Sequence, residues 1–281
     1  MMKLKRKTKL KIIALVLAGL LSLCVILAGC IVLPEVCKKN KRYDDTKNFV
    51  NGRVQTVAHR GASGLALENT VFAFEEAGRR DYYGIEADVQ LTADGKFIIA
   101  HDSNLQRFGI DISIEQSDFA TLRALRFKDI YDATGEEKCF LPTVEEYINI
   151  CKKYNKQAVL EIKGKMIADK IWELAQDISA LGWFEKTTFI SFHRDNLTAL
   201  RRSYPNASAQ YLVKRVEKGD IEFMLQNKID GNFFWASITP ARVRKLHKAG
   251  LKVNCWTVDT RPCALYMRVC GVDMITTNIL E

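Results

Sequence analysis

The sequence predicts an α/β fold, a distorted (β/α)8 barrel preceded by a transmembrane helix, and three observations support the barrel. Short apolar segments alternate with amphipathic helical segments from residue 55 onward, a pattern typical of a mostly parallel sheet. A strand recurs about every 25 residues, as in the TIM barrel. The turn at 92–95 joins two strands too tightly for a crossover helix, so one strand must be irregular or antiparallel. A doubly wound open sheet is the alternative fold.

The predicted elements follow one another without a long polar linker or an internal repeat, which indicates one folded domain. Segments rich in β-branched and apolar residues are the candidate strands: 56–59, 84–89, 97–101, 158–162, 187–192, 209–213, 231–235, 253–258 and 274–277. Amphipathic segments are the candidate helices: 70–79, 118–125, 144–154, 167–181, 195–203, 217–227, 240–249 and 261–270.

The amino-terminal segment differs in composition from the rest. Residues 12–33 carry no charge, and as a helix they would reach about 33 Å, enough to cross a hydrocarbon core. We therefore expect 1–33 to hold a membrane anchor, 34–54 to be a polar linker, and 55–281 to be the folded domain, outside the cytoplasm. A lipoprotein lipidated at Cys30, in a Leu-Ala-Gly-Cys box, and a cleaved signal peptide are the alternatives.

The net charge of +9 comes from the same tail. Residues 1–42 carry ten basic side chains and one acidic one, and the remaining 32 basic and 32 acidic residues cancel. The folded part thus has no charge excess of the kind that favours nucleic acid. The cysteines show no CxxC pair or metal-ligand spacing, so those of the folded domain are predicted to be free and buried: Cys139, Cys151, Cys255, Cys263 and Cys270.

Residues able to carry chemistry concentrate in 57–107. Glu86 and Asp88 are spaced i, i+2 in a candidate strand, so both side chains point to one face. His59 and His101 each follow a candidate strand, and the carboxyl ends of parallel strands are where α/β proteins build active sites. The pattern indicates a site for a hard divalent cation beside two imidazoles suited to proton transfer near neutral pH.

The motifs that contain these residues resemble those of the glycerophosphodiester phosphodiesterase family. The resemblance covers the chain from Val57 onward and rests on several motifs in order: HRG at 59–61, ENT at 68–70, GIEADV at 84–89, TxDG at 92–95, HDxxLxR at 101–107, LPTVEE at 141–146, LEIK at 160–163, ISF at 190–192, WTV at 256–258 and GVD at 271–273.

The resemblance implies a TIM barrel that hydrolyses glycerophosphodiesters, such as glycerophosphocholine and glycerophosphoethanolamine, to glycerol 3-phosphate and an alcohol. It implies one bound Mg²⁺ or Ca²⁺ and attack by the neighbouring glycerol hydroxyl, through a cyclic phosphate. Carried over to this sequence, the family's roles fall on an acid/base pair, three metal carboxylates and two phosphate-facing cations: His59 and His101; Glu86, Asp88 and Glu161; Arg60 and Lys163.

Other candidates have supporting roles. Glu68 and Asn69 are expected to position the first loop, and Trp256 to form an apolar wall for the substrate or to pack in the core. His193 and His247 are expected at the surface.

Three residues depart from the family pattern, namely Leu67, Phe108 and Asn278. We expect none of them to touch the acid/base or metal residues. Residues 108–140 are poorly patterned and follow the second histidine, so they are expected to cover the mouth of the barrel and to set specificity.

Two other functions remain open at this level. The membrane segment motivates a lysophospholipase D or sphingomyelinase D-like activity on membrane lysolipids, which a hydrophobic groove beside the metal would favour; a tight polar pocket would favour a small diester. A non-catalytic surface binding module is the third hypothesis, and the presence of every implied catalytic residue argues against it. The expected partners are a small-molecule substrate and the membrane, and the oligomeric state stays open.

Overall fold

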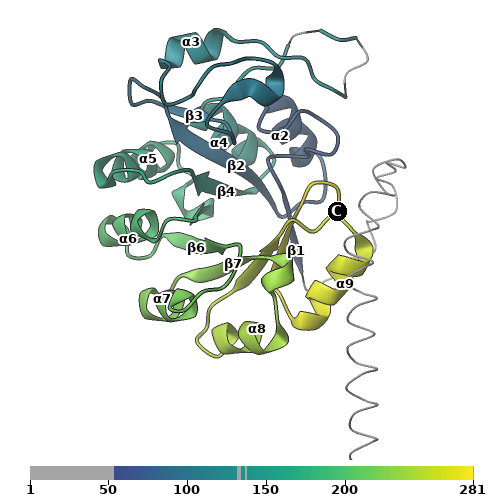
Figure 1. Ribbon diagram of the computed structural model, residues 1–281, viewed down its shortest axis with the longest axis vertical. Helices are drawn as coiled ribbons and strands as arrows, with labels where there is room; N and C mark the ends of the chain where they lie inside the picture. The colour runs from purple at the N-terminus through teal and green to yellow at the C-terminus, as the bar shows by residue number, and fades with distance from the viewer. Residues whose placement is uncertain (1–53, 132–133, 137, 281) are drawn as a thin grey trace, which may run out of the picture.

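Eight parallel strands close into a barrel surrounded by helices in the computed structural model, which describes residues 54–131, 134–136 and 138–280 (Figure 1). The strands follow one another around the barrel as β1-β9-β8-β7-β6-β5-β4-β2, and β1 also pairs with β2, which closes the ring. The barrel prediction is therefore confirmed, and the doubly wound alternative is wrong.

All nine predicted strands are present, within a few residues of the expected bounds. They are β1 Gln55–Ala58, β2 Gly84–Leu91, β3 Phe97–Ile99, β4 Gln157–Ile162, β5 Thr187–Ser191, β6 Ser208–Val213, β7 Asp230–Phe234, β8 Val253–Trp256 and β9 Met274–Thr277. The eight predicted helices are also present. They are α2 Val71–Gly78, α3 Phe119–Ala124, α4 Val144–Lys153, α5 Ala168–Ala180, α6 Arg194–Ser203, α7 Asp220–Asn227, α8 Pro240–His247 and α9 Arg261–Cys270.

The irregular strand is β3, which pairs antiparallel with β2 in the register Val89↔Ile99. The turn between them is closed by the Thr92 N–H, which donates to the Lys96 carbonyl at 2.9 Å, and Gly95 adopts a φ of +70° that few other residues tolerate. Because β3 only extends the outer part of β2, the next barrel strand is β4, which pairs with β2 in parallel.

The helix ends follow from local sequence. Thr143 and Glu146 form a reciprocal capping box that begins α4. Thr239 and Thr260 cap α8 and α9, and each is followed by proline within the first helical turn. Gly271 ends α9 with a φ of +88°.

Side chains alternate between the barrel interior and the helix layer. Val57, Val159, Ile190 and Leu212, each from a different strand, form a small apolar cluster with Trp256 packed against it. On the other face of the strands, residues such as Ile85 join the larger core shared with the helices: Ala58, Ala87, Val89, Ala158, Leu160 and Ile162. Glu86, Asp88 and Glu161 point to the same side of the strands as Val159, which is opposite to the side of Ile85. This alternation therefore places the three carboxylates inside the barrel.

A polar network lies beside that interior cluster. The Gln210 side-chain oxygen accepts hydrogen bonds from Asn232 Nδ2 at 2.9 Å and Asn254 Nδ2 at 3.3 Å, and Asn254 also donates to Thr276 Oγ1 at 3.1 Å. These buried side chains, three amides and one hydroxyl, come from β6, β7, β8 and β9, so they hold neighbouring strands together. Asn232 and Thr276 also line a cavity at this end of the barrel.

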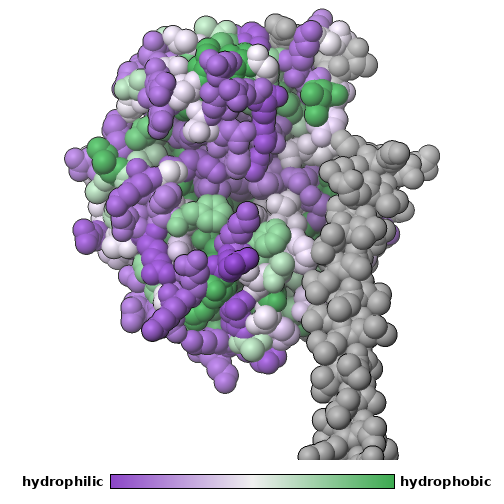
Figure 2. Space-filling view, viewed as in Figure 1, coloured by the Kyte–Doolittle hydropathy of each residue, from purple (hydrophilic) through white to green (hydrophobic). Residues whose placement is uncertain are grey.

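The segment after β3 packs mainly on itself. Leu105, Ile114, Leu122 and Phe127 form a separate buried cluster with Leu67 and neighbouring apolar residues, and α3 lies at the top of the view in Figure 1, outside the barrel. Figure 2 shows apolar residues near the middle of the face turned to the viewer, framed by hydrophilic ones.

The predicted anchor at 12–33, Cys30 and the linker at 34–53 lie outside the described residues. Within the described part of the chain, no helix has both the length and the apolar character needed to cross a membrane. The five cysteines of the barrel domain are buried thiols that form no disulfide, as expected.

Candidate active site

Three carboxylates meet inside the barrel at the carboxyl ends of two neighbouring strands. Asp88 on β2 lies in register with Glu161 on β4, and Glu86 precedes Asp88 on the same face of β2. One oxygen from each carboxylate lies within 4.8 Å of those of the other two. All three residues are buried, so few water molecules are available to offset their charge.

Two cations lie against this cluster. Lys163 Nζ is 2.9 Å from Glu161 Oε1 and 3.4 Å from Asp88 Oδ1. Arg60 donates its backbone N–H to Glu86 Oε2 at 2.7 Å, and its Nε lies 3.6 Å from Asp88 Oδ2. Arg60 has a φ of +59°, a rare conformation in which its backbone N–H and its guanidinium group both face the carboxylates.

The carboxylates differ in proton affinity. Burial, together with Asp88 and Glu161, raises the pKa of Glu86 well above its usual value. Burial and Asp88 raise the pKa of Glu161 to about 7. Burial acts on Asp88 in the same direction, but Lys163 and Arg60 outweigh it and hold the pKa of Asp88 below its usual value. A divalent cation would favour the ionised form of all three groups.

The donor set fits a hard cation. All three candidate ligands offer carboxylate oxygens, which suit Mg²⁺ or Ca²⁺ better than zinc. Asp88 Oδ1 is buried and has no hydrogen-bond partner among the described residues, although Lys163 lies 3.4 Å away. A buried anionic oxygen in this state has coordinating capacity to spare.

His59 follows β1, and its Nδ1 lies 2.8 Å from the Asn278 side-chain oxygen. Asp259 fixes the orientation of that amide, because Asn278 Nδ2 donates to Asp259 Oδ2 at 2.6 Å and a carboxylate can only accept. The backbone N–H of Asn278 donates to the same carboxylate at 2.8 Å. His59 must therefore carry its proton on Nδ1, which leaves Nε2 without one.

The pKa of His59 is lowered to about 3, mainly by burial and then by the charge of Arg60. The imidazole is therefore neutral at pH 7. Asn278 was expected to touch none of the acid/base residues, and that expectation is wrong. The contact spans 219 positions in sequence and exists only because β1 and β9 are neighbours in the closed barrel.

His101 has a different partner. Its Nδ1 lies 2.6 Å from Asp102 Oδ1, and Arg107 Nε lies 2.8 Å from Asp102 Oδ2. Burial lowers the pKa of His101, while Asp88 and Asp102 oppose this change. The two histidines thus face partners of different charge, a neutral amide for His59 and a carboxylate for His101.

Glu68 and Asn69 connect the first loop to neighbouring side chains. Glu68 pairs with Arg60, at 2.8 Å between Oε1 and Nη1, and also with Arg107. Asn69 donates to Asp88 Oδ2 at 2.8 Å and accepts from the Asp88 N–H at 3.2 Å. Asn69 therefore fixes the orientation of a central carboxylate, whereas Glu68 ties together two arginines.

Trp256 forms part of an aromatic wall. Its ring lies 5.6 Å from the rings of both Phe192 and Phe234, measured between centroids. The cavity beside this wall has a volume of about 250 Å³ and brings both histidines together with two of the carboxylates. Its lining residues are His59, Arg60, Glu86, His101, Glu161, Ile190, Phe192, Leu212, Lys214, Asn232, Trp256, Thr257 and Thr276.

The remaining predictions have mixed outcomes. His193 is exposed and His247 is exposed with its Nε2 2.9 Å from Asp273, so neither lines the cavity. Among the described residues of 108–140, none lines the catalytic cavity; Phe108 and Phe127 border only a small neighbouring void. Most of the apolar residues of this stretch pack in a cluster of their own, while the Tyr131 hydroxyl donates to the Ser63 carbonyl in the first loop at 3.0 Å. The expectation that this stretch covers the mouth and sets specificity stays a prediction.

Several residues at the site were not predicted. Asp102 was visible in the HD motif but had no assigned role, and Asp259 directly follows the WTV motif. Phe192 and Lys214 follow strands β5 and β6, so their place at strand ends was the available signal. Their convergence depends on barrel closure, which no local pattern specifies.

A parallel barrel that gathers acidic oxygens, two cations and paired histidines at its carboxyl edge is suited to hydrolysis of a phosphate diester. The chain belongs to the glycerophosphoryl diester phosphodiesterase family, whose model matches residues 59–281. It is therefore an enzyme of the phosphodiesterase class.

Relatives and solved structures agree with this membership. The chain is 31% identical over 268 residues to glycerophosphodiester phosphodiesterase 1 of Bos taurus, covering 82% of this chain and 79% of the relative. It is 29% identical over 233 residues to a glycerophosphodiester phosphodiesterase of Caldanaerobacter subterraneus, a match that covers 79% of this chain and 93% of that relative. The structure of an Oleispira antarctica phosphodiesterase, solved in complex with the product sn-glycerol-3-phosphate, matches with a TM-score of 0.72 and 25% sequence identity. The match covers 81% of this chain and 94% of that chain.

Proposed function

We propose that this chain hydrolyses glycerophosphodiesters to glycerol 3-phosphate and an alcohol, with one Mg²⁺ or Ca²⁺ held by Glu86, Asp88 and Glu161. The observation that carries the proposal is that one cavity of about 250 Å³ is lined by both histidines and by two carboxylates of this acidic cluster, with the third carboxylate, Asp88, within 4.8 Å of those two. The bound cation would supply positive charge that offsets the charge of the phosphate as the transition state forms. Arg60 and Lys163 lie beside the carboxylates and would add to that effect.

In this proposal His59 is the general base. It is neutral at pH 7 and keeps Nε2 free to accept a proton, since Nδ1 donates to Asn278. The proton comes from the glycerol hydroxyl next to the phosphodiester, whose oxygen attacks phosphorus. The bond from phosphorus to the leaving oxygen breaks, and a cyclic phosphate forms.

His101 is the general acid that protonates the leaving oxygen. The Asp102 carboxylate at 2.6 Å favours the imidazolium form needed for this role and so opposes burial, which lowers the pKa of His101. In the second step His101 takes a proton from water as the water attacks the cyclic phosphate. His59 then returns its proton to the glycerol oxygen, which gives glycerol 3-phosphate.

The size of the cavity favours a small diester over a lysolipid. A space of about 250 Å³ with polar groups on one side and the Trp256 wall on the other matches a glycerophosphate unit. The larger cavity that adjoins it is lined by four charged residues, which makes it a poor site for an acyl chain: Lys214, Arg215, Glu217 and Asp220.

The test is product analysis with the full chain on glycerophosphocholine and on lysophosphatidylcholine. We expect glycerol 3-phosphate and choline from the first substrate, with little turnover of the second. Choline and lysophosphatidic acid formed from the lipid alone would instead establish lysophospholipase D activity. No hydrolysis of either substrate, or of other glycerophosphodiesters, would refute the proposed function.

Exchanging Asp259 and Asn278, in the double variant Asp259→Asn with Asn278→Asp, tests the role of His59. The exchange keeps one carboxylate and one amide in contact but places the carboxylate next to His59. A carboxylate stabilises the imidazolium, so the pKa of His59 rises. We expect the acidic limb of the pH profile of kcat/KM to move about one pH unit or more toward higher pH.

The other charged groups near His59, namely Arg60, Asp88 and His101, are unchanged in this variant. The single variant Asn278→Asp is the comparison, since it sets two carboxylates against each other and is expected to lower thermal stability. A double variant with the wild-type pH profile would show that His59 does not titrate in the observed limb.

A further inference from the structure

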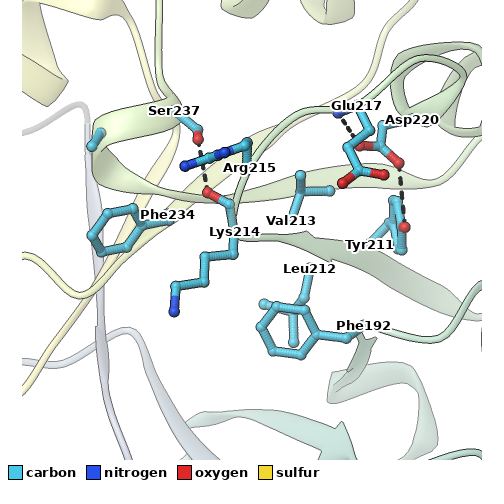
Figure 3. Close-up of a pocket in the computed structure, with 11 residues that line it drawn as sticks. Phe192, Tyr211, Leu212, Val213, Lys214, Arg215, Glu217, Asp220, Phe234 and Ser237 are labelled. Atoms are coloured by element: carbon cyan, nitrogen blue, oxygen red, sulfur yellow. Dashed lines mark hydrogen bonds between the residues drawn. The ribbon is translucent and has the colours of Figure 1, made fainter.

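A second and larger cavity adjoins the catalytic one. It has a volume of about 750 Å³ and lies beyond the ends of β5, β6 and β7 (Figure 3). Both cavities are lined by Phe192, Leu212 and Lys214, so these three residues form the border between them. A molecule seated at the carboxylate cluster could therefore extend past this border into the second cavity, which we call the outer groove.

The outer groove has walls of mixed character. Phe192 and Phe234 provide aromatic surface, and the remaining lining residues are Tyr211, Leu212, Val213, Lys214, Arg215, Glu217, Asp220, Ala236 and Ser237. The backbone of its centre is fixed, because Ser237 Oγ donates to the Lys214 carbonyl at 2.8 Å. The groove is thus preformed by ordered strand ends and the short helical turn after β7, Trp235–Ser237.

Some charged side chains of the outer groove have partners within the protein and others do not. Asp220 is already paired, with Arg194 and with the Tyr211 hydroxyl at 3.3 Å. The side chains of Lys214 and Arg215 make no hydrogen bond or ion pair with the described residues. Both are exposed, so their charges can meet a ligand without first breaking an internal contact.

The positions of these charges matter. Figure 3 shows the Lys214 side chain extending away from its strand on the side of Phe192 and Phe234, with its ammonium group free. Glu217 lies on the opposite side of the groove, beside Asp220. The charge at the border with the catalytic cavity, that of Lys214, is therefore positive.

We propose that the outer groove binds the leaving alcohol and that Lys214 makes it selective for alcohols that carry negative charge. The proposal rests on the proposed function, since it assigns the glycerophosphate half of the substrate to the catalytic cavity. The alcohol on the other side of phosphorus then lies next to Lys214. An anionic group on this alcohol is attracted by the ammonium, and a quaternary ammonium is repelled.

The test compares three substrates that share the glycerophosphate half. Glycerophosphoinositol 4-phosphate, glycerophosphoinositol and glycerophosphocholine have leaving alcohols that are anionic, neutral and cationic. We expect kcat/KM of the full chain to decrease in that order. In the Lys214→Glu variant the ratio of kcat/KM for the anionic to the cationic substrate is expected to fall about tenfold or more.

The matched control is Lys218→Glu, which makes the same change in net charge at an exposed lysine that does not line the groove. This control is expected to change the ratio by less than about twofold, because solvent screens an exposed charge that does not line the groove. The proposal would be overturned if the ratio of kcat/KM for the anionic to the cationic substrate were the same in the two variants. It would also be overturned if Lys214→Glu lost activity equally toward all three substrates, because that result would indicate that Lys214 contacts the phosphate. Hydrolysis of none of the three by the wild-type chain would instead refute the proposed function itself.

Discussion

Replacing His59 with glutamine is expected to lower kcat/KM for glycerophosphocholine by about 10³-fold. The variant keeps a polar side chain that can still reach Asn278, but it removes the Nε2 atom that accepts the proton in the proposed mechanism. The measurement is steady-state release of glycerol 3-phosphate at saturating metal ion, together with the melting temperature of the variant.

His193→Gln is the matched control, since it makes the same change at an exposed histidine outside the cavity. Its activity is expected to stay within about twofold of the wild type, as is usual for a surface position. If a folded His59→Gln enzyme retained wild-type kcat/KM, the assignment of His59 as the base would be wrong.

Removing the divalent cation is expected to lower activity by about 10³-fold, since the phosphate would then face the acidic cluster without its main source of positive charge. Chelation with EDTA followed by dialysis tests this, and added Mg²⁺ or Ca²⁺ is expected to restore activity. The Asp88→Asn variant should show a loss of similar size that added cation does not restore. Asp88 is the one carboxylate of the cluster whose pKa is held below its usual value, so it provides the firmest anionic ligand.

Metal binding by calorimetry separates a lost cation site from a damaged fold. The wild-type chain is expected to bind one equivalent, and Asp88→Asn to bind none while it melts cooperatively. Asp195→Asn serves as the control, because Asp195 forms only an exposed ion pair with Lys165, at 2.7 Å. Full activity of the dialysed, metal-free wild-type enzyme would exclude the proposed role of the cation.

Most of the barrel can be predicted from the sequence because its strands and helices have strong local patterns. The alternation around Glu86 and Asp88 predicts their shared face, and the tight turn after β2 predicts an irregular strand. Which strand was reversed could not be read locally. That choice depends on the pairing of β2 with both β1 and β4, which leaves β3 on the outside.

The site was predicted as far as residue types in motifs allow. The motifs placed His59, His101 and the three carboxylates together. The structure brings both histidines and two of the carboxylates to one cavity, and the third carboxylate, Asp88, lies against those two. The side chains that orient the histidines, Asn278 for His59 and Asp102 for His101, were not predicted. Asn278 was noted only as a departure, since nothing in its local sequence indicates that it meets His59 across 219 positions.

The packing of 108–140 could not be predicted, for a related reason. A segment without clear periodicity gives no information about where it packs, and here its apolar residues contact one another and Leu67. The walls of the cavity come from β5, β6 and β8 instead, through residues such as Phe192, Lys214 and Trp256.

The pairing of β1 with β9 has a consequence for biosynthesis. His59 lies at the end of the first strand, while the amide that orients it follows the ninth, and β9 also closes the ring against β1. A nascent chain that has emerged only as far as β8 already contains every proposed metal ligand and both histidines. It still lacks the orienting partner of His59, so catalytic competence is acquired late, when β9 and Asn278 dock against β1.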